Sequence, residues 1–170
     1  FDGGDYCHFL RASIKRDDPF RFHNVSSFGM IGVALPYALG AQVALPGKKV
    51  VLANGDGSLG FNGMEIDTMV RHNLPVKMFI GNNSIWGIDW QIQKGIYGRP
   101  VWTDLLPTRY DVMAQGLGAF GEHVTKADEL EGAMGRAFDH DGPALLNIDI
   151  EKIISPVAEA AISRKTGSHG

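Results

Sequence analysis

The chain has almost no cysteine: Cys7 is the single one among its 170 residues, so no internal disulfide can form. Proteins without disulfides fit a reducing compartment, and we expect this one in the cytoplasm. A lone cysteine can act as a catalytic nucleophile, but one near a chain terminus is more often an ordinary packing residue. Cys7 is therefore not a leading candidate for an active site.

The sequence also lacks an excess of charge. It carries 16 Lys and Arg against 19 Asp and Glu, a formal net charge of −3, and it has no basic block. Nucleic-acid binding requires a basic patch, so we expect no nucleic-acid partner. The apolar runs are too short to cross the hydrocarbon core of a bilayer, so we expect no membrane association.

Glycine is abundant, with 22 residues that lie between apolar runs rather than in a repeat. That placement is typical of tight turns and of close backbone approaches. Hydrophobic residues make up 44% of the chain and charged residues 21%, which is the balance of a globular protein. We expect one domain at residues 1–160 and a polar C-terminal tail at 161–170.

Short apolar runs bounded by turn residues predict strands that are covered on both faces. These runs are Lys49–Ala53, Val76–Ile80 and Ala144–Ile150, with a shorter strand at Glu122–Val124. Helical patterns occupy Gly32–Ala44, Asn62–His72, Tyr110–Leu117 and Ala127–Phe138. Strands that alternate with helices predict an α/β fold, a mostly parallel sheet with helices on both faces.

Two segments are harder to interpret. Phe1–Asp5 has the pattern of a strand end, and the stretch 85–107, which mixes tryptophan and tyrosine with glycine, is expected to be one long connection. Long ordered loops are usually functional. The alternative is a surface excursion whose aromatic side chains pack on the domain or on a partner, and the sequence leaves both interpretations open.

Two turns carry the chemistry. Gly55-Asp56-Gly57 follows one predicted strand and Asn82-Asn83 follows the next, and ligands of parallel sheets bind beyond the carboxyl ends of strands. Glycines let the backbone approach an anion, and a hard divalent cation takes carboxylate, amide and carbonyl oxygens. Asp56, Asn83 and the carbonyl of Ile85 would supply these three oxygens. The pair of turns therefore predicts a site for a cation and a diphosphate.

Either turn alone is a weak signal, because most Gly-Asp-Gly triplets are ordinary turns. The specificity comes from both turns in a strand-turn-helix-strand context, with residues 58–81 between them. A flavodoxin-like or dinucleotide-binding module is the competing interpretation. Residues 55–60 do fit the pattern Gly-x-Gly-x-x-Gly, but the dinucleotide fingerprint also needs an acidic residue about 20 positions further on, and Asn82-Asn83 stand there instead. No P-loop lysine-serine pair is present either, so that interpretation is disfavoured.

The segment from Gly55 to Asn83 resembles the signature of thiamine diphosphate-dependent enzymes, in which Gly-Asp-Gly is followed by Asn-Asn. The resemblance extends upstream over Phe28–Pro36 and downstream to Gly142–Ala144, and so covers nearly the whole chain. It is closest to the C-terminal, pyrophosphate-binding domain of a group that contains acetolactate synthase, oxalyl-CoA decarboxylase, 2-hydroxyacyl-CoA lyase and benzaldehyde lyase. The implied architecture is the thiamine diphosphate-binding fold.

The resemblance implies a role for each matching residue. Asp56 and Asn83 would bind Mg²⁺ through their side chains, and Ile85 through its carbonyl. The diphosphate would be held by Gly55, Gly57 and Ser58.

On the pyrimidine side, the Gly29 carbonyl would accept a hydrogen bond from the amino group of the cofactor. Ile31 would bend the cofactor, although without the motif it would be taken for an ordinary core residue. Ile88 and Trp90 are the candidates for substrate contacts.

The implied reaction is thiamine diphosphate- and Mg²⁺-dependent cleavage or formation of a carbon–carbon bond next to a carbonyl. A 2-hydroxyacyl-CoA lyase-like enzyme is favoured, with an acetolactate synthase-like carboligase or a 2-oxo acid or oxalyl-CoA decarboxylase as the alternative. A cofactor-binding scaffold subunit is the alternative that is not an enzyme. The small-molecule substrate could be an acyl-CoA.

The family's activating glutamate lies on a separate pyrimidine-binding domain, which nothing in this sequence resembles. The catalytic residue within this chain is therefore unknown. We expect that domain on the same longer chain or on a partner subunit, no turnover by this chain alone, and a homodimer or homotetramer.

Overall fold

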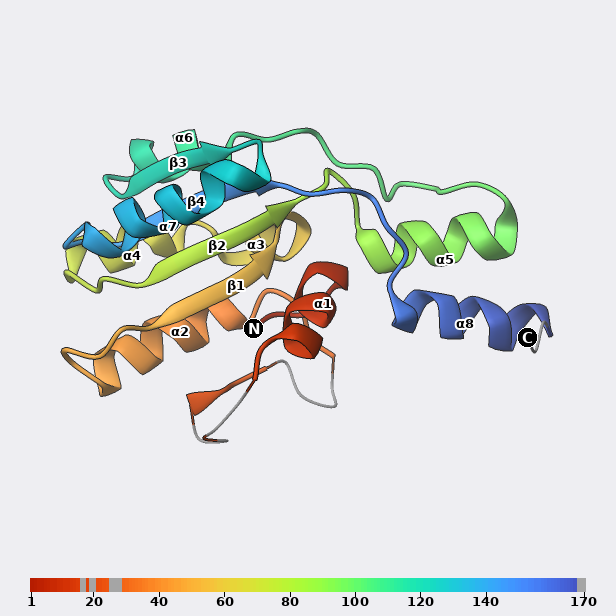
Figure 1. The fold of residues 1–170 in the computed structure, drawn as a ribbon, viewed down its shortest axis with the longest axis horizontal. Helices are drawn as coiled ribbons and strands as arrows, with labels where there is room; N and C mark the ends of the chain where they lie inside the picture. Colours follow the sequence, from red (N-terminus) through yellow and green to blue (C-terminus); the bar gives the residue numbers. More distant parts are fainter. Residues whose placement is uncertain (16–17, 19–20, 25–28, 168–170) are drawn as a thin grey trace.

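The computed structural model describes residues 1–15, 18, 21–24 and 29–167. Its sheet consists of β1 (Val51–Gly55), β2 (Lys77–Asn82), β3 (Phe120–Val124) and β4 (Ala144–Asp149). The strands lie in the order β1-β2-β4-β3, and every neighbouring pair is parallel (Figure 1). The predicted α/β fold with a parallel sheet is confirmed.

The helices cover both faces of this sheet. They are α1 (Asp5–Ser13), α2 (Ala34–Ala44), α3 (Asp56–Asn62), α4 (Glu65–Arg71), α5 (Gly87–Tyr97), α6 (Tyr110–Gly116), α7 (Leu130–Asp139) and α8 (Pro156–Thr166), with a 3-10 turn at Ala127–Glu129. One apolar core joins the sheet to α2, α3, α4 and α6, and a second joins it to α7.

Alternation along the central strands explains the two cores. On β4, Leu145 belongs to the core under α2 and α4, whereas Leu146 belongs to the core under α7. On β2, Met78 and Phe79 divide in the same way. Successive side chains of a strand point to opposite faces, so an unbroken apolar run is what a strand buried on both faces requires.

The stretch 85–107 was predicted to be one long connection. The structure differs, because Gly87–Tyr97 forms helix α5. The helix ends at Gly98, whose φ of 76° is a left-handed conformation that glycine adopts easily. Helix α5 packs on α8, a helix that lies far away in the sequence (Figure 1). Gly95 permits that packing, since a Cβ at this position would lie 2.5 Å from the Ile162 side chain.

The two ends of the chain also differ from expectation. Phe1–Asp5 does not form a strand: Asp5 begins α1, although the Asp2 N–H donates to the Ala53 carbonyl of β1. The expected polar tail is helical as far as Thr166, so the expected boundary after residue 160 falls inside α8. Residues 168–170 of that tail, and Phe28, lie outside the described residues.

Helix α8 is well specified at its start. Ser155 precedes it, accepts a hydrogen bond from the Ala158 N–H through its hydroxyl, and is followed by proline at the first helical position. Among the helices that the structure describes, none is long and apolar enough to cross a membrane.

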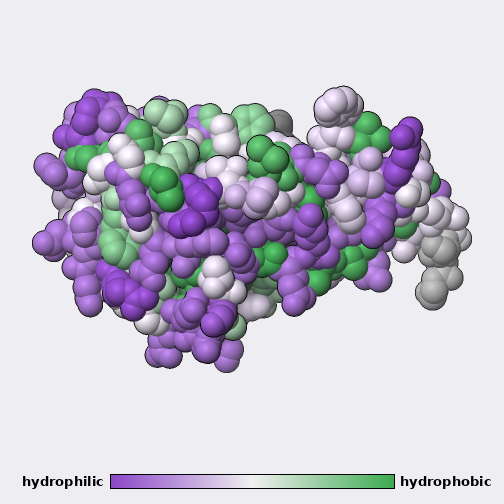
Figure 2. All heavy atoms as spheres, turned by 90° about the horizontal axis from the view of Figure 1, so that it is seen from above, coloured by the Kyte–Doolittle hydropathy of each residue, from purple (hydrophilic) through white to green (hydrophobic). Residues whose placement is uncertain are grey.

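Apolar and polar side chains are interspersed over the face shown in Figure 2, including the narrower end formed by α5 and α8. Large apolar side chains are strongly exposed at the end of α5 and in the segment after it. They include Tyr97, Trp102 and Leu106, of which Trp102 is 95% exposed.

Candidate functional site

The two predicted turns lie side by side. β1 pairs with β2 in a register that places Gly55 opposite Gly81, so Asp56 and Asn82 follow at the same edge of the sheet. Asp56 is the first residue of α3, and Asn82 is the last residue of β2. The carboxyl ends of two neighbouring parallel strands therefore bring both turns together, as the sequence predicted.

A small cavity of about 40 Å³ opens between these turns. Its lining includes the predicted metal ligands Asp56, Asn83 and Ile85, and the predicted diphosphate residues Gly55, Gly57 and Ser58. A water molecule occupies about 30 Å³ in the liquid, so the space has the size of an ion or of one or two water-sized groups. Most of a larger ligand would lie outside it.

The carboxylate of Asp56 is buried at this cavity, with the residue 3% exposed. Its Oδ2 accepts a hydrogen bond of 2.9 Å from the Ser84 N–H. Burial raises the pKa of Asp56 to about 6, and the backbone N–H groups of Gly57 and Ser84 only partly oppose that rise. The charge of Lys152 also lowers this pKa but does not overcome the effect of burial. A buried carboxylate whose pKa remains raised is stabilised by a cation, so the environment of Asp56 fits a metal ligand.

The cavity holds a second carboxylate that sequence reasoning missed. Asp5, the first residue of α1, lines it and is also buried. Burial raises the pKa of Asp5, and the Ser155 hydroxyl opposes this rise, although neither carboxylate oxygen has a hydrogen bond of normal geometry. A second buried carboxylate that lines the same cavity as Asp56 adds to its attraction for a cation.

Among the described residues, no three His, Cys, Asp or Glu side chains form a group that could hold a metal ion. A cation at this cavity would therefore depend on amide, backbone and ligand oxygens as well as on carboxylates. Mg²⁺ is commonly bound in this way, through one or two carboxylates together with the phosphates of a substrate.

The backbone around Ile85 is fixed by a short antiparallel contact with residues 103–105. The Trp86 N–H donates to the Thr103 carbonyl, and the Leu105 N–H donates to the Ser84 carbonyl, both at 2.8 Å. Backbone groups of neighbouring residues in an extended chain point to opposite sides. The carbonyl of Ile85 therefore points away from residues 103–105 and is available to a ligand.

Gly57 permits a close approach of Trp86. A Cβ at position 57 would lie 2.8 Å from the indole ring, a separation that real Cβ atoms do not show. Ser58 is buried in the first turn of α3. Both residues line the cavity, and their predicted contact with a diphosphate remains a prediction.

Gly29 and Ile31 lie in the segment that precedes α2, apart from the residues that line the cavity. The buried Asp2, which sequence reasoning missed, anchors this segment by accepting hydrogen bonds from the N–H groups of Gly32 (3.0 Å) and Ala34 (2.9 Å). Its own neighbour Gly3 donates a third. The segment that holds Gly29 and Ile31 is thus hydrogen-bonded to Asp2, near the start of the chain.

Ile88 and Trp90 lie on α5, outside the lining of the cavity. The indole N–H of Trp90 donates to Asp104 at 3.0 Å, and the Lys94 ammonium lies 4.8 Å from the ring centre. These contacts give Trp90 a structural role, and the substrate contacts of both residues remain predictions.

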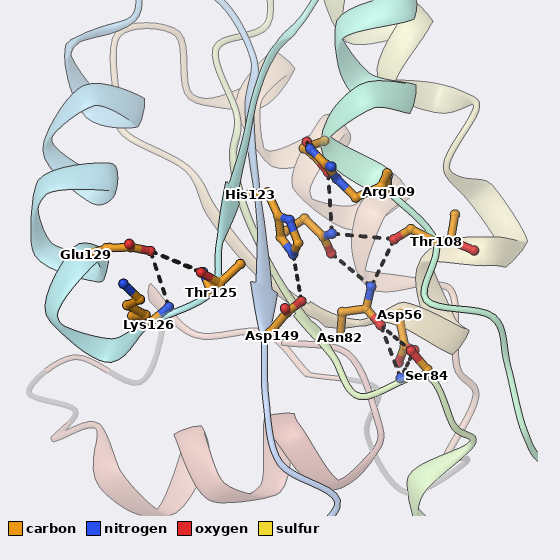
Figure 3. A network of polar contacts seen from close by, with 12 residues as sticks. Asp56, Asn82, Ser84, Thr108, Arg109, His123, Thr125, Lys126, Glu129 and Asp149 are labelled. Atoms are coloured by element: carbon orange, nitrogen blue, oxygen red, sulfur yellow. Dashed lines mark hydrogen bonds and ion pairs between the residues drawn. The ribbon is translucent and has the colours of Figure 1, made fainter.

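A network of buried amides behind the cavity was not foreseen from the sequence (Figure 3). The side chain of Asn82 donates to the Thr108 carbonyl at 3.0 Å and to the Asn147 side chain at 3.1 Å, and it accepts from the Ser84 N–H at 3.1 Å. The side chain of Asn147 in turn donates a hydrogen bond to Asp111, which forms an ion pair with Arg109. Asn82, the first asparagine of the pair, thus bonds to Thr108 and Asn147, while Asn83 lines the cavity.

Comparison with known proteins agrees with this geometry. Residues 2–148 match the family model described as thiamine pyrophosphate enzyme, C-terminal TPP binding domain. The chain is 42% identical over 148 residues to an acetolactate synthase large subunit of Mycobacterium tuberculosis, covering 86% of this chain and 27% of that protein.

Two further relatives are named for other reactions. Oxalyl-CoA decarboxylase of Escherichia coli is 38% identical over 152 residues, which cover 88% of this chain and 27% of that protein. 2-Hydroxyacyl-CoA lyase 2 of Caenorhabditis elegans is 33% identical over 157 residues, which cover 89% and 24%. The chain thus spans about a quarter of the length of these relatives.

Proposed function

The chain belongs to the family of C-terminal thiamine pyrophosphate-binding domains of thiamine pyrophosphate enzymes, and from this premise we propose that its cavity binds Mg²⁺ and the diphosphate of the cofactor. The complete protein would cleave or form a carbon–carbon bond next to a carbonyl. The observation that carries the proposal is the convergence of Asp56, Asn83 and Ile85 on one small cavity between two glycine-flanked strand ends.

Each residue would have a defined task. Asp56 would supply the carboxylate of the Mg²⁺ site, Asn83 its amide oxygen and Ile85 its carbonyl, a set of hard oxygen ligands suited to that ion. Gly57 and Ser58 would contact the diphosphate.

When bound, thiamine diphosphate supplies a nucleophilic ring carbon and an electron sink. Gly29 and Ile31 would orient its other end, and the activating glutamate would come from a pyrimidine-binding domain on the longer chain or on a partner subunit. We further propose that the complete protein is a homodimer or homotetramer.

Within this reaction class we propose a 2-hydroxyacyl-CoA lyase-like activity. The candidate that competes with it is an acetolactate synthase-like carboligase, which is supported by the 42% identity to the mycobacterial protein. A decarboxylase is supported by the 38% identity to the oxalyl-CoA enzyme. Residues outside this chain would contribute to the choice, because the chain covers about a quarter of these relatives.

Replacement of Asp56 by alanine tests the cofactor site. In the complete protein we expect Asp56→Ala to abolish Mg²⁺-dependent binding of thiamine diphosphate, measured by isothermal titration calorimetry, because the site loses its only proposed carboxylate ligand. Asp149→Ala is the matched control, since Asp149 ends the neighbouring strand β4 with a half-exposed side chain. Unchanged binding by Asp56→Ala would contradict the proposal and favour a different phosphate-binding module.

The three candidate reactions are distinguished by assaying the complete protein with pyruvate, with a 2-hydroxyacyl-CoA and with oxalyl-CoA. We expect aldehyde and formyl-CoA release from the 2-hydroxyacyl-CoA. Acetolactate formation from pyruvate, or carbon dioxide release from oxalyl-CoA, would assign one of the alternatives. Cofactor binding without turnover of any of the three would support the scaffold interpretation.

A further inference from the structure

The turn that carries two of the proposed metal ligands contains a residue in an unfavourable conformation. Ser84, between Asn83 and Ile85, has a φ of 56°, in the left-handed region that side chains with a Cβ disfavour. Its N–H is shared by two acceptors, Asp56 Oδ2 at 2.9 Å and Asn82 Oδ1 at 3.1 Å. The position of Asn83 and Ile85 therefore depends on both acceptors being in place.

The amide of Asn82 can serve Ser84 in one orientation only. Its oxygen accepts from the Ser84 N–H, while its nitrogen donates to the Asn147 side chain and to the Thr108 carbonyl (Figure 3). If this amide were rotated by half a turn, its NH₂ group would face the Ser84 N–H, and two donors would oppose each other. The turn therefore requires that Asn82 present its oxygen to Ser84.

Asn147 and the Thr108 carbonyl together hold that orientation. The side-chain oxygen of Asn147 accepts from Asn82 at 3.1 Å, and its nitrogen faces Asp111 Oδ1 and the Thr108 carbonyl, both at 3.4 Å. An ionised carboxylate is an acceptor only, so Asp111 requires the NH₂ side of Asn147. With that side occupied, only the oxygen of Asn147 is left to face Asn82.

Asp111 can impose this direction because it is held in place. Asp111 is 1% exposed, and the Arg109 guanidinium donates to both of its carboxylate oxygens, at 2.9 and 2.6 Å. The chain of contacts runs from this ion pair on α6, through the ends of β4 and β2, to the turn and to Asp56. The side-chain bonds of the two amides all run in one direction along this chain, and the Thr108 carbonyl, which accepts from both amides, favours the same direction.

From this arrangement we infer that Asp111 is a positioning residue for the proposed metal site, acting through the amide orientations of Asn147 and Asn82. The inference rests on the proposed function, because it concerns the same cavity. It assigns Asp111 no contact with the metal. Its role is to keep the Asn82 oxygen on Ser84, and so to keep Asn83 and Ile85 turned toward the cavity.

A purely structural role for Asp111 predicts something different. If burial and packing were all that mattered, every polar substitution in the network would weaken the site in proportion to the stability that it removes. If orientation matters, moving the carboxylate one step along the chain should restore most of the affinity, although the Thr108 carbonyl then loses its bond from position 147. In the double variant Asp111→Asn/Asn147→Asp, the new carboxylate at 147 still accepts from Asn82, and the amide at 111 can donate to it.

The experiment measures Mn²⁺ binding by the complete protein in the presence of thiamine diphosphate, from the electron paramagnetic resonance signal of free Mn²⁺. We expect Asp111→Asn to raise the Kd about tenfold or more, the range typical of residues that orient metal ligands. The double variant should return the Kd most of the way to the wild-type value. The melting temperature without metal is recorded for each variant, as the measure of structural damage.

Asp149→Asn is the control, because Asp149 is opposite Asn82 in the pairing of β2 with β4 but bonds to His123 instead. Its Kd should equal that of the wild type. An unchanged Kd in Asp111→Asn, or a double variant that binds Mn²⁺ no more tightly than Asp111→Asn, would overturn the inference. If Asp56→Ala itself binds Mn²⁺ normally, the proposed function fails, and this outcome is distinct from failure of the Asp111 role.

A further pair of variants keeps the test decisive if Asp111→Asn does not fold. Replacement of both partners of a buried polar pair by apolar groups of similar shape is often nearly neutral for stability. Asp111→Leu/Asn147→Leu should therefore fold while removing the Asn147 acceptor and leaving the Asn82 nitrogen with the Thr108 carbonyl as its remaining acceptor in the network. We expect it to bind Mn²⁺ about tenfold more weakly than Asp111→Asn/Asn147→Asp, and equal affinities would overturn the inference.

Discussion

At the scale of single residues, Asp111 is buried yet remains charged. Burial raises the pKa of its carboxyl, but the hydrogen bonds and the charge of Arg109 outweigh that effect and hold the pKa below its ordinary value. A carboxyl whose pKa is lower in the folded than in the unfolded state stabilises the fold above its unfolded pKa. That contribution is lost as the pH falls through the folded pKa.

The lowered pKa of Asp111 predicts how the stability of the Asp111→Asn variant depends on pH. At pH 7 we expect its free energy of unfolding to be lower than that of the wild type by about 1–3 kcal/mol, the usual cost of weakening a buried charged hydrogen bond. Below about pH 4, where the unfolded carboxyl takes up protons, the difference should shrink. Urea unfolding of both proteins between pH 7 and pH 3.5 measures it, and a pH-independent difference would contradict the assignment.

Cys7 is buried in the same region of the chain as Asp5 but takes no part in the site. Burial raises the pKa of its thiol to about 12, and the thiol lies 3.4 Å from the Ala53 carbonyl. We expect no reaction with dithionitrobenzoate in the native protein at pH 8, because the reactive thiolate is absent and access is blocked. One thiol per chain should react once the protein is unfolded in guanidinium chloride, and rapid labelling of the native protein would disprove the burial.

The residues that sequence reasoning found and those that it missed differ in how far apart their partners lie. Asp56 and Asn83 were predicted because each directly follows a strand, and Ile85 because it lies two residues after Asn83, all of them local features. Asp111 and Asn147 were not, because their bond joins positions separated by 36 residues, and no local pattern encodes it. Asp2 was missed for the same reason, because the residues that it anchors, Gly32 and Ala34, lie 30 and 32 positions away along the chain.

At the scale of helices and strands, the four strands were predictable from apolar periodicity within two residues of their ends, and α2, α4, α6 and α7 within three. Helix α5 was missed, because glycine and aromatic residues obscure its helical pattern and it packs on α8 rather than on the sheet. Helices α1, α3 and α8 were missed too: α1 follows a segment with the pattern of a strand end, α3 begins in a triplet with the composition of a turn, and α8 runs into the segment predicted as a polar tail. These failures concern segments whose structure depends on tertiary packing.

The contact between β3 and α6 depends on one glycine. A Cβ at Gly121 would overlap the backbone carbonyl of Asp111, which cannot move without displacing α6. We expect Gly121→Ala to lower the free energy of unfolding by about 1–3 kcal/mol, as overpacking in a rigid core does. Gly135→Ala on α7 is the control, with nothing within 4 Å of its Cβ and a gain of up to about 1 kcal/mol.

Guanidinium unfolding monitored by circular dichroism measures both glycine variants. If Gly121→Ala were as stable as Gly135→Ala, β3 and α6 would have to be more loosely packed than the structure shows.

At the scale of the whole molecule, the sheet separates two apolar cores that share its central strands. Leu145 and Leu146 are both fully buried and face opposite cores. We expect each substitution by alanine to cost about 2–5 kcal/mol, the range for a leucine in a packed core. Because β4 belongs to both cores, each variant should lower the midpoint of one common transition.

Urea unfolding followed by both tryptophan fluorescence and circular dichroism tests this coupling, since coincident curves indicate a single cooperative unit. A second transition that is insensitive to one of the two substitutions would show that the cores unfold separately.

The register of β1 on β2 has a consequence for how much length variation the site can tolerate. Gly55 lies opposite Gly81 whatever number of residues the chain uses to travel from one strand to the next. Extra residues inserted between α4 and β2, at positions 72–76, would lengthen the interval between the two turns and leave the cavity unaltered. One extra residue inside β2 would turn the side chains that follow it to the opposite face of the sheet and separate Asn83 from Asp56.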